Sequence, residues 1–266
     1  MNTAALTGGT PKISIRDMTL VHVNEERRQS NVAVENLTLD IMENEFLCVV
    51  GPSGCGKSTL LSAIAGFMQP QTGTVTMNGE RITKPGADRG VVFQEYALLP
   101  WKTVLDNVAL GLKFRGVPTA DREAKAMEYI AMARLTEAAK KYPHELSGGM
   151  RQRAAVARTL ANTPEIMMMD EPFAAVDAQT RLSLQEELLR VWNDNPITVL
   201  FITHSVEEAV FLADRVAVLT PGPGKLREIV EIDIPRNARH WDTITSDPEF
   251  IALRDRVMAL VRDQNG

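Results

Sequence analysis

Residues 51–58 read GPSGCGKS and match the pattern G-x-x-x-x-G-K-[ST], which is typical of a loop that binds phosphate. Glycine lets successive backbone N–H groups point inward at an anion, and the N-terminus of a following helix adds partial positive charge. We expect Lys57 to reach the β- and γ-phosphates of a nucleotide and the Ser58 hydroxyl to bind Mg²⁺. The residues predicted to bind nucleotide here are Gly51, Pro52, Ser53, Gly54, Cys55, Gly56, Lys57, Ser58 and Thr59.

A second group of chemically capable residues follows the apolar run 166–169. Asp170 is placed to hold Mg²⁺ through a water molecule, and Glu171 to orient and polarise an attacking water. Taken alone, this segment is better explained as an ordinary acidic junction between a strand and a loop. The combination with the phosphate loop favours the catalytic interpretation, because paired motifs in one α/β sheet are far more specific than either motif alone.

A third motif, HELSGGMRQR at residues 144–153, places a serine and two glycines before a strong helix-forming sequence. A helix that begins on Ser147, Gly148 and Gly149 presents free backbone N–H groups to an anion. By itself the motif is equally consistent with a flexible helix start. The arginines that follow could either brace a γ-phosphate or form ion pairs with acids of the surrounding helical segment.

These three motifs, in this order, resemble those of the ATP-binding subunits of ABC transporters, and the likeness covers residues 12–235. The resemblance implies an α/β fold, namely the P-loop NTPase fold of ABC ATPases, with a mostly parallel core sheet, an antiparallel β subdomain and a helical subdomain. It also implies that Gln94 contributes to the metal and water site, that Asp177 lies in the D-loop and helps to bind the nucleotide, and that His204 contacts the γ-phosphate.

Physical reasoning supports two of these placements independently. Gln94 and His204 each follow a short apolar run, so in a parallel sheet both are expected at the carboxyl edge, where ligands of such sheets bind. We interpret His204 as a ligand of the γ-phosphate and not as a base that competes with Glu171, because a ring N–H can donate to developing negative charge.

In the family that this chain resembles, Ser147, Gly148 and Gly149 face the nucleotide bound to a second subunit. The resemblance therefore implies a head-to-tail dimer that encloses two ATP molecules, in which one chain alone carries half of each site. This chain departs from the family pattern at Met150, where many members have glutamine. It also places His22, instead of a larger aromatic residue, at the position that stacks on adenine.

Strands and helices must position these residues, and the apolar patterns predict them along the whole chain. Short apolar runs indicate strands, and longer stretches with helical periodicity indicate helices. The expected units are a flexible N-terminus at 1–11, an ATP-binding domain at 12–235 with a helical subdomain at about 97–163, and a C-terminal helical extension at 236–266. Strands are predicted within 12–23, 32–41, 45–51, 72–82, 89–94, 165–170, 197–203, 215–220 and 225–234, a charged loop or hairpin at 24–31, and helices within 57–67, 121–142, 150–161, 178–194 and 247–263.

The composition narrows the possible partners. The 266 residues are 44% hydrophobic with a net charge of -5, which argues against a nucleic-acid partner held by a basic surface. The two cysteines, Cys48 and Cys55, do not suggest a disulfide framework, and a reducing cytoplasm fits best. No apolar run is long enough to span a bilayer, so we expect any membrane function to require a separate spanning subunit.

The segments PGADRGVVFQ, LLPW and DPEF resemble the importer group that serves taurine, alkyl-sulfonates and nitrate. The resemblance implies an ATPase at the cytoplasmic face of the bacterial inner membrane, bound to transmembrane permease subunits and served indirectly by a solute-binding protein. The expected cofactors are ATP and Mg²⁺. The alternatives are a soluble ABC-type ATPase that remodels a macromolecule, which usually has two cassettes or a long coiled-coil insertion, and a non-catalytic interaction module.

Overall fold

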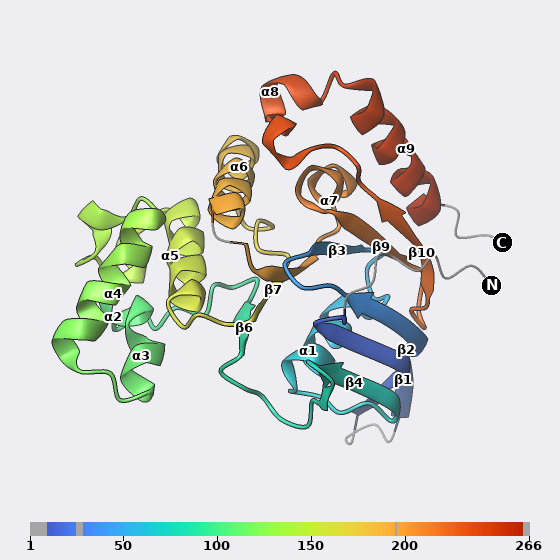
Figure 1. Ribbon diagram of the computed structural model, residues 1–266, viewed down its shortest axis with the longest axis horizontal. Coiled ribbons are helices and arrows are strands. Elements are labelled where there is room, and N and C mark those ends of the chain that lie inside the picture. Colours follow the sequence, from blue (N-terminus) through green and yellow to red (C-terminus); the bar gives the residue numbers. More distant parts are fainter. Residues whose placement is uncertain (1–9, 25–28, 195, 263–266) are drawn as a thin grey trace.

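The computed structural model describes residues 10–24, 29–194 and 196–262. It contains two sheets, a helical lobe and a C-terminal helical segment (Figure 1). The expected flexible segment at 1–11 lies almost entirely outside the described residues.

A six-stranded sheet forms the centre of the molecule, with strand order β10-β9-β3-β8-β7-β6. The pairs β3–β8, β3–β9, β7–β8 and β6–β7 are parallel, and only β10 runs antiparallel to its neighbour. The expectation of a mostly parallel core sheet is confirmed. The strands are β3 (Phe46–Val50), β6 (Arg89–Val92), β7 (Ile166–Asp170), β8 (Thr198–Ile202), β9 (Arg215–Leu219) and β10 (Leu226–Glu231).

An antiparallel sheet with strand order β2-β1-β4-β5 packs beside the central sheet. The segment 72–82, predicted to contain a strand, forms two strands joined by a turn at Asn78 and Gly79, whose φ angles of 51° and 82° suit a tight hairpin. The charged segment 24–31 is partly strand, because β1 continues to Asn24 and β2 begins at Gln29. The strands are β1 (Ile13–Asn24), β2 (Gln29–Ile41), β4 (Thr72–Met77) and β5 (Glu80–Arg81).

The helical lobe lies between β6 and β7 in the chain and has its own small core, which includes Val108, Ile130 and Ala154. The helix predicted over 121–142 ends at Met132, because Arg134 adopts a left-handed φ of 53° and the chain turns there. The helices of the lobe are α2 (Val104–Val108), α3 (Leu110–Phe114), α4 (Thr119–Met132), η1 (Thr136–Ala138), η2 (Pro143–Glu145) and α5 (Gly148–Leu160).

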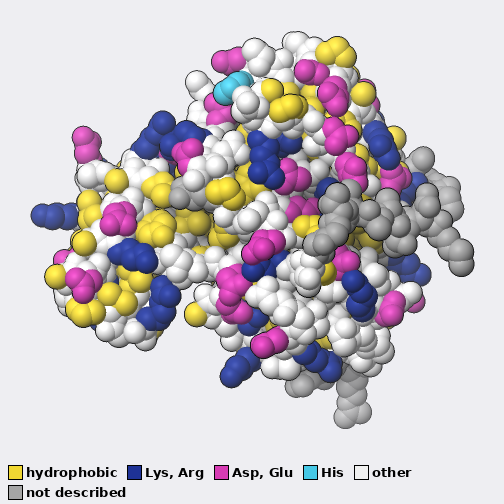
Figure 2. All heavy atoms as spheres, in the orientation of Figure 1, with side chains coloured by type: hydrophobic (Ala, Val, Ile, Leu, Met, Phe, Trp, Pro, Cys, Tyr) yellow, Lys and Arg dark blue, Asp and Glu magenta, His cyan; other side chains and the backbone are white. Residues whose placement is uncertain are grey.

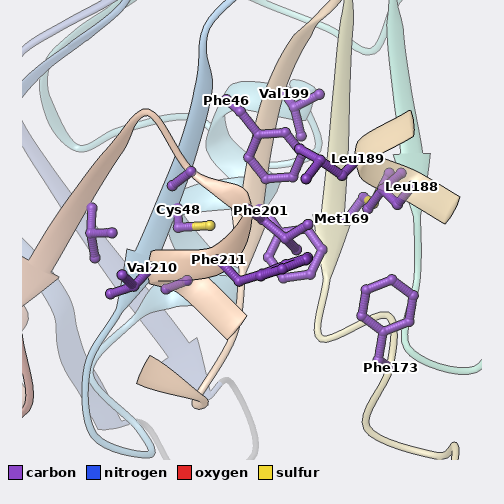
Figure 3. Close-up of a cluster of buried hydrophobic side chains, with 14 of the residues drawn as sticks. Phe46, Cys48, Met169, Phe173, Leu188, Leu189, Val199, Phe201, Val210 and Phe211 are labelled. Carbon is purple, nitrogen blue, oxygen red and sulfur yellow. The ribbon is translucent and has the colours of Figure 1, made fainter. Parts of the chain in front are cut away.

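The inner strands of the central sheet are buried on both faces, because alternate residues of each strand enter different cores. In β3, Phe46 and Cys48 join the core beneath α6 (Ala178–Asp194) and α7 (Val206–Leu212), whereas Leu47 joins the core shared with α1 (Lys57–Ala65) and the antiparallel sheet. Figure 3 shows the first of these clusters, in which the ring centroids of Phe46 and Phe201 lie 5.7 Å apart.

The helical lobe meets the core along an apolar seam between α4, α5 and α6. Met132, Val156 and Leu188 are among the side chains that line it. Figure 2 shows hydrophobic side chains gathered along this junction. The lobe is therefore a separately packed body held to the core by a limited strip of contacts.

The C-terminal segment packs on α7 and on the outer strands of the central sheet. Phe250 and Val257 are buried, and Leu253, Leu260 and Val261 pack against the same core, so the helix predicted within 247–263 has one apolar face that packs on the core. No helix of the described residues is long and apolar enough to cross a membrane. The elements of this segment are η3 (Arg236–Ala238), α8 (Trp241–Ile244) and α9 (Pro248–Arg262).

Arg239 connects the C-terminal segment to the core through hydrogen bonds. Its side chain is 2% exposed and donates four hydrogen bonds to the carbonyl oxygens of Phe211, Ala213 and Ile234 at 2.7–3.1 Å. Burial lowers its pKa to about 10, so the guanidinium stays charged at neutral pH. It therefore supplies the missing donors at the end of α7.

We expect Arg239→Met to lower the free energy of unfolding by about 2 to 4 kcal/mol, because several buried carbonyl oxygens lose a charged donor at once. Urea denaturation followed by circular dichroism measures the change. The matched control is Arg262→Met at an exposed position of α9, where a shift within about 0.5 kcal/mol is expected. Equal stability of the two variants would contradict the assigned role of Arg239.

Candidate functional site

The carboxyl ends of four parallel strands meet at one edge of the central sheet. Val92 of β6 is paired with Met169 of β7, and Asp170 of β7 is paired with Ile202 of β8. Ile202 is in turn paired with Val49 of β3. The segments that leave these strands therefore share this edge, which is where parallel sheets bind ligands. They carry the loop 51–58, Gln94, Glu171 and His204.

The loop between β3 and α1 has the backbone of an anion-binding turn. Gly54 and Gly56 have φ angles of 78° and 92°, which other residues rarely adopt. A Cβ atom on Gly56 would lie 2.6 Å from the carbonyl oxygen of Ala33, so the loop also requires glycine where it approaches β2. Gly56 is the N-cap of α1, whose first turn opens into the loop.

Lys57 is folded back onto this loop. Its side chain is buried, and Nζ donates to the carbonyl oxygens of Gly51 and Pro52 at 2.9 and 3.1 Å. Ser53, Gly54 and Ser58 are exposed. An ammonium held by two carbonyl oxygens of the loop is already positioned at the anion site, and a phosphate would replace one of these partners.

Ser58 and Asp170 are brought together across the sheet edge. Ser58 Oγ donates to Asp170 Oδ1 at 3.1 Å. Burial raises the pKa of Asp170, and the neighbouring Glu171 adds to this, while the bond from Ser58 and the charge of Lys57 oppose it. A hydroxyl and a carboxylate at this spacing form a partial oxygen site suited to a hard cation.

Glu171 and His204 form the second contact of the site. His204 Nδ1 lies 3.3 Å from Glu171 Oε2, and the histidine side chain is 60% exposed. Glu171 has a left-handed φ of 44°, and its backbone N–H donates to the Ile202 carbonyl oxygen at 2.9 Å. Such strained backbone persists where the surrounding structure holds it and is frequent at active sites.

The serine and glycines of the third motif begin α5 in the helical lobe. Ser147 is exposed, and its Oγ accepts from the backbone N–H of Met150 at 3.3 Å, so it is the N-cap of the helix. The two glycines differ. A Cβ atom on Gly148 would meet nothing closer than 3.7 Å, whereas one on Gly149 would lie 2.8 Å from Thr180 Cγ2 of α6. Close packing of α5 on α6 therefore explains Gly149, and only Gly148 lacks a packing explanation.

Three further predicted residues lie around this framework. His22 is exposed on β1, and its Nε2 lies 2.8 Å from Thr59 Oγ1 of α1, beside the phosphate loop. Asp177 precedes α6, and its Oδ1 accepts from the backbone N–H of Thr180 at 3.0 Å, which lowers its pKa. Gln94 is exposed two residues beyond β6.

The arginines after the third motif contact groups of the core as well as of the helical lobe. Arg153 Nε lies 3.9 Å from Glu187 Oε2, but Glu187 belongs to α6 of the core and not to the helical segment. The Arg151 guanidinium lies 6.0 Å from the ring centroid of Tyr96. Arg153 Nη1 also donates to the carbonyl oxygens of Ala133 and Arg134 at 3.3 and 3.5 Å, so this side chain contacts both the helical segment and the core.

Sequence reasoning missed Arg158. It donates to the carbonyl oxygens of Tyr96 and Ala97 at 3.0 and 2.6 Å, and both of those residues have left-handed φ angles of 61° and 47°. Burial lowers the pKa of Arg158. An arginine within an amphipathic helix carries no signal of this role, because its partners are backbone atoms of a distant loop.

Comparison with known proteins identifies the family. The sequence profile described as ABC transporter matches residues 34–174. A taurine import ATP-binding protein of Rhizobium johnstonii is 48% identical over 232 residues, covering 86% of this chain and 88% of that protein. A nitrate import ATP-binding protein of Synechococcus elongatus is 46% identical over 230 residues, covering 85% and 84%.

Solved structures agree with the sequence relatives. A dimeric ATP-binding cassette in a post-hydrolysis state, bound to ADP and Pi, is 31% identical with a TM-score of 0.72 and covers 83% of this chain and 98% of that chain. The family and fold predicted from the three motifs are thus confirmed. The chain belongs to the ABC transporter family and is one of its ATP-binding, ATP-hydrolysing subunits.

Proposed function

We propose that this ATPase powers the import of a small anionic solute, such as taurine, an alkyl-sulfonate or nitrate, and that it acts as a dimer with two ATP molecules between the subunits. One observation carries the dimer proposal. The phosphate loop, Glu171 and His204 lie at the edge of the core sheet, whereas Ser147 lies exposed at the N-terminus of α5 in the helical lobe. The similarity to taurine import and nitrate import ATP-binding proteins supports the solute class.

In the closed dimer, Ser147 and the amide of Gly148 would meet the γ-phosphate of the ATP bound to the partner's phosphate loop, since a helix N-terminus favours an anion. Gly149 would add its amide while allowing α5 to stay packed on α6. Asp177 lies at the start of α6, next to this approach. Each nucleotide then contacts both subunits, and hydrolysis removes the bridging γ-phosphate, so ATP favours the closed state and ADP the open one.

Glu171 is assigned as the base that orients and polarises the attacking water. Its Oε2 faces His204 at 3.3 Å, which leaves Oε1 to orient the water. With a proton on each ring nitrogen, His204 would donate from Nδ1 to Glu171 and from Nε2 to the γ-phosphate. Gln94 would position the water from the neighbouring strand end. His22 is assigned to stacking on adenine.

Ser58, Asp170 and Gln94 are the residues that would hold Mg²⁺. No group of three or more His, Cys, Asp or Glu side chains among the described residues could hold a metal ion. The oxygen pair of Ser58 and Asp170 at 3.1 Å fits Mg²⁺, which takes few protein ligands and completes its shell with phosphate oxygens and water. When bound, Mg²⁺ neutralises charge on the β- and γ-phosphates.

The proposed partners are a second copy of the chain, transmembrane permease subunits and, indirectly, a solute-binding protein. We assign permease docking to the segment Leu98–Trp101, which follows Gln94 along the chain. Leu98 and Leu99 are half-buried, and the Trp101 side chain is 71% exposed. Exposed aromatic side chains of this size are frequent in protein interfaces. This arrangement would place the protein peripherally at the cytoplasmic face of the membrane.

For Asp170→Asn we expect loss of Mg²⁺-dependent ATP hydrolysis without loss of stability. Because the folded-state pKa lies above the ordinary value of 3.8, the folded protein binds more protons than the unfolded chain, so the carboxylate lowers stability as the pH rises above 3.8. Asparagine keeps an acceptor for Ser58 and removes this penalty. Urea unfolding at several pH values should show that the variant is at least as stable as the wild type at pH 7. A decrease of more than about 1 kcal/mol in the free energy of unfolding would contradict the conclusion that the buried carboxylate lowers stability.

For Glu171→Gln we expect ATP hydrolysis to fall by about 100-fold or more, because the amide cannot accept the proton of the attacking water. The variant should still bind ATP and accumulate as a dimer, which size-exclusion chromatography with ATP detects. Glu123→Gln on the exposed face of α4 is the control and should behave as the wild type. A monomeric, fully active Glu171→Gln variant would refute both the base and the dimer.

For Ser147→Arg we expect ATP turnover to be abolished while ATP binding to the isolated chain stays within about threefold of the wild type, because the lost contact belongs to the partner's nucleotide. Binding is measured by isothermal titration calorimetry and turnover by phosphate release. Ser246→Arg, at an exposed position after α8, is the matched control. Loss of ATP binding by the isolated Ser147→Arg chain would contradict the contact across the dimer.

A further inference from the structure

Glu208 is a buried carboxylate beside the site that none of the roles above uses. It lies in the first turn of α7, four residues after His204, and its side chain is only 5% exposed. Burying an ionisable carboxylate costs stability unless its oxygens are hydrogen-bonded, so its retention in the core calls for an explanation.

Both oxygens of Glu208 accept hydrogen bonds from different elements. The Thr203 hydroxyl, at the end of β8, donates to Oε2, and Gln185 Nε2 of α6 donates to Oε1 at 2.6 Å. Thr203 and Gln185 are each 2% exposed. Arg181, one turn earlier on α6, adds favourable charge, yet burial still raises the pKa of Glu208. The carboxylate therefore joins β8, α6 and α7 inside the core.

The same bonds define the turn that presents His204. Thr203 Oγ1 accepts from the backbone N–H of Ser205 at 3.0 Å, and Ser205 Oγ accepts from the backbone N–H of Glu208 at 3.3 Å. His204 thus sits between two residues whose hydroxyls are tied to Glu208. Its own side chain is 60% exposed and makes its contact with Glu171 at 3.3 Å, so its direction depends on the turn.

The connection continues to the catalytic carboxylate on one side and to α6 on the other. A small hollow beside the turn is lined by Glu171, Arg181, His204 and Glu208, which places the four side chains around one space. Arg181 also donates to the Val176 carbonyl oxygen at 2.9 Å, in the segment that leads into α6. A movement of α6 would therefore be transmitted to the turn of His204 through Gln185 and Glu208.

We propose that Glu208 is a positioning residue for ATP hydrolysis, which holds the turn of His204 against α6 so that the imidazole meets both Glu171 and the γ-phosphate. The proposal rests on the roles assigned above to Glu171 and His204. In the roles assigned above, Glu208 contacts neither the nucleotide nor the attacking water, and it acts through the Thr203 hydroxyl. Its effect is therefore confined to steps that involve the γ-phosphate.

The decisive substitutions change single atoms inside the network. Glu208→Gln keeps the size of the side chain but puts an amide N–H₂ where a second acceptor is required. Thr203→Val replaces the hydroxyl by a methyl group of similar size. Each is expected to lower the turnover of ATP by about tenfold or more, and the double variant to be no slower than the slower single variant, because both break one connection. Thr203→Ser restores the hydroxyl and should recover most of the activity that Thr203→Val loses.

The experiment uses the full chain and measures steady-state phosphate release, ADP binding by isothermal titration calorimetry, and thermal unfolding. ADP lacks the γ-phosphate, so its affinity should stay within about twofold of the wild type in every variant if Glu208 acts only by positioning. The matched control is Glu207→Gln, the adjacent exposed residue of α7, whose Oε1 lies 3.7 Å from Arg254 Nη1. It makes the same charge change and should leave turnover unaltered.

The outcomes separate the two proposals. If His204→Ala and Glu171→Gln leave turnover unchanged, the proposed site itself is wrong. If those two variants are inactive while Glu208→Gln and Thr203→Val stay within about twofold of the wild type, only the positioning role is refuted. If turnover by the Glu208→Gln and Thr203→Val variants falls together with ADP affinity, or if these variants unfold at a lower temperature, Glu208 is a structural residue. That result would also overturn the inference.

Discussion

Parallel pairing of β3, β8, β7 and β6 is the constraint on which the rest of the molecule depends. The carboxyl ends of parallel strands lie at the same edge of the sheet. Residues that follow these strands therefore lie close together even when they are far apart in the sequence and do not contact one another. The register carries Ile202 beside both Val49 and Asp170. The strands β3, β7 and β8 are buried on both faces, so a shift of the register by one residue would move apolar side chains from one core to the other. The geometry of the site is thereby stabilised by the hydrophobic cores.

Strain and buried charge are concentrated at this same edge. Glu171 has a left-handed φ, Asp170 has a raised pKa, and Glu208 is a carboxylate enclosed by protein. Each of these features is unfavourable by itself and is held by neighbours that belong to other strands or helices. In such a site several elements hold each group in place, which suits a reaction that depends on positioning a water and a phosphate more than on covalent chemistry.

The helical lobe is organised differently. It has its own apolar core and meets the central sheet through a seam and a few directed bonds, notably those of Arg158 to the loop after Gln94. Close packing of α5 on α6 at Gly149 places the exposed Ser147 at the surface of this lobe. The N-terminus of α5 thus lies exposed on a lobe that packs separately from the core. This arrangement is consistent with the proposal that a second subunit completes each nucleotide site.

Local pattern sufficed to determine the phosphate loop, the strands that bear Asp170 and His204, and the family, because each depends on residues adjacent in the chain and on the periodicity of burial. The end of α4 near Met132, the partner of Arg153 on α6, the packing reason for Gly149 and the network around Glu208 were decided only by tertiary structure. Those features join elements that lie far apart in the sequence, and the identity of one residue says nothing about which distant backbone or side chain will meet it.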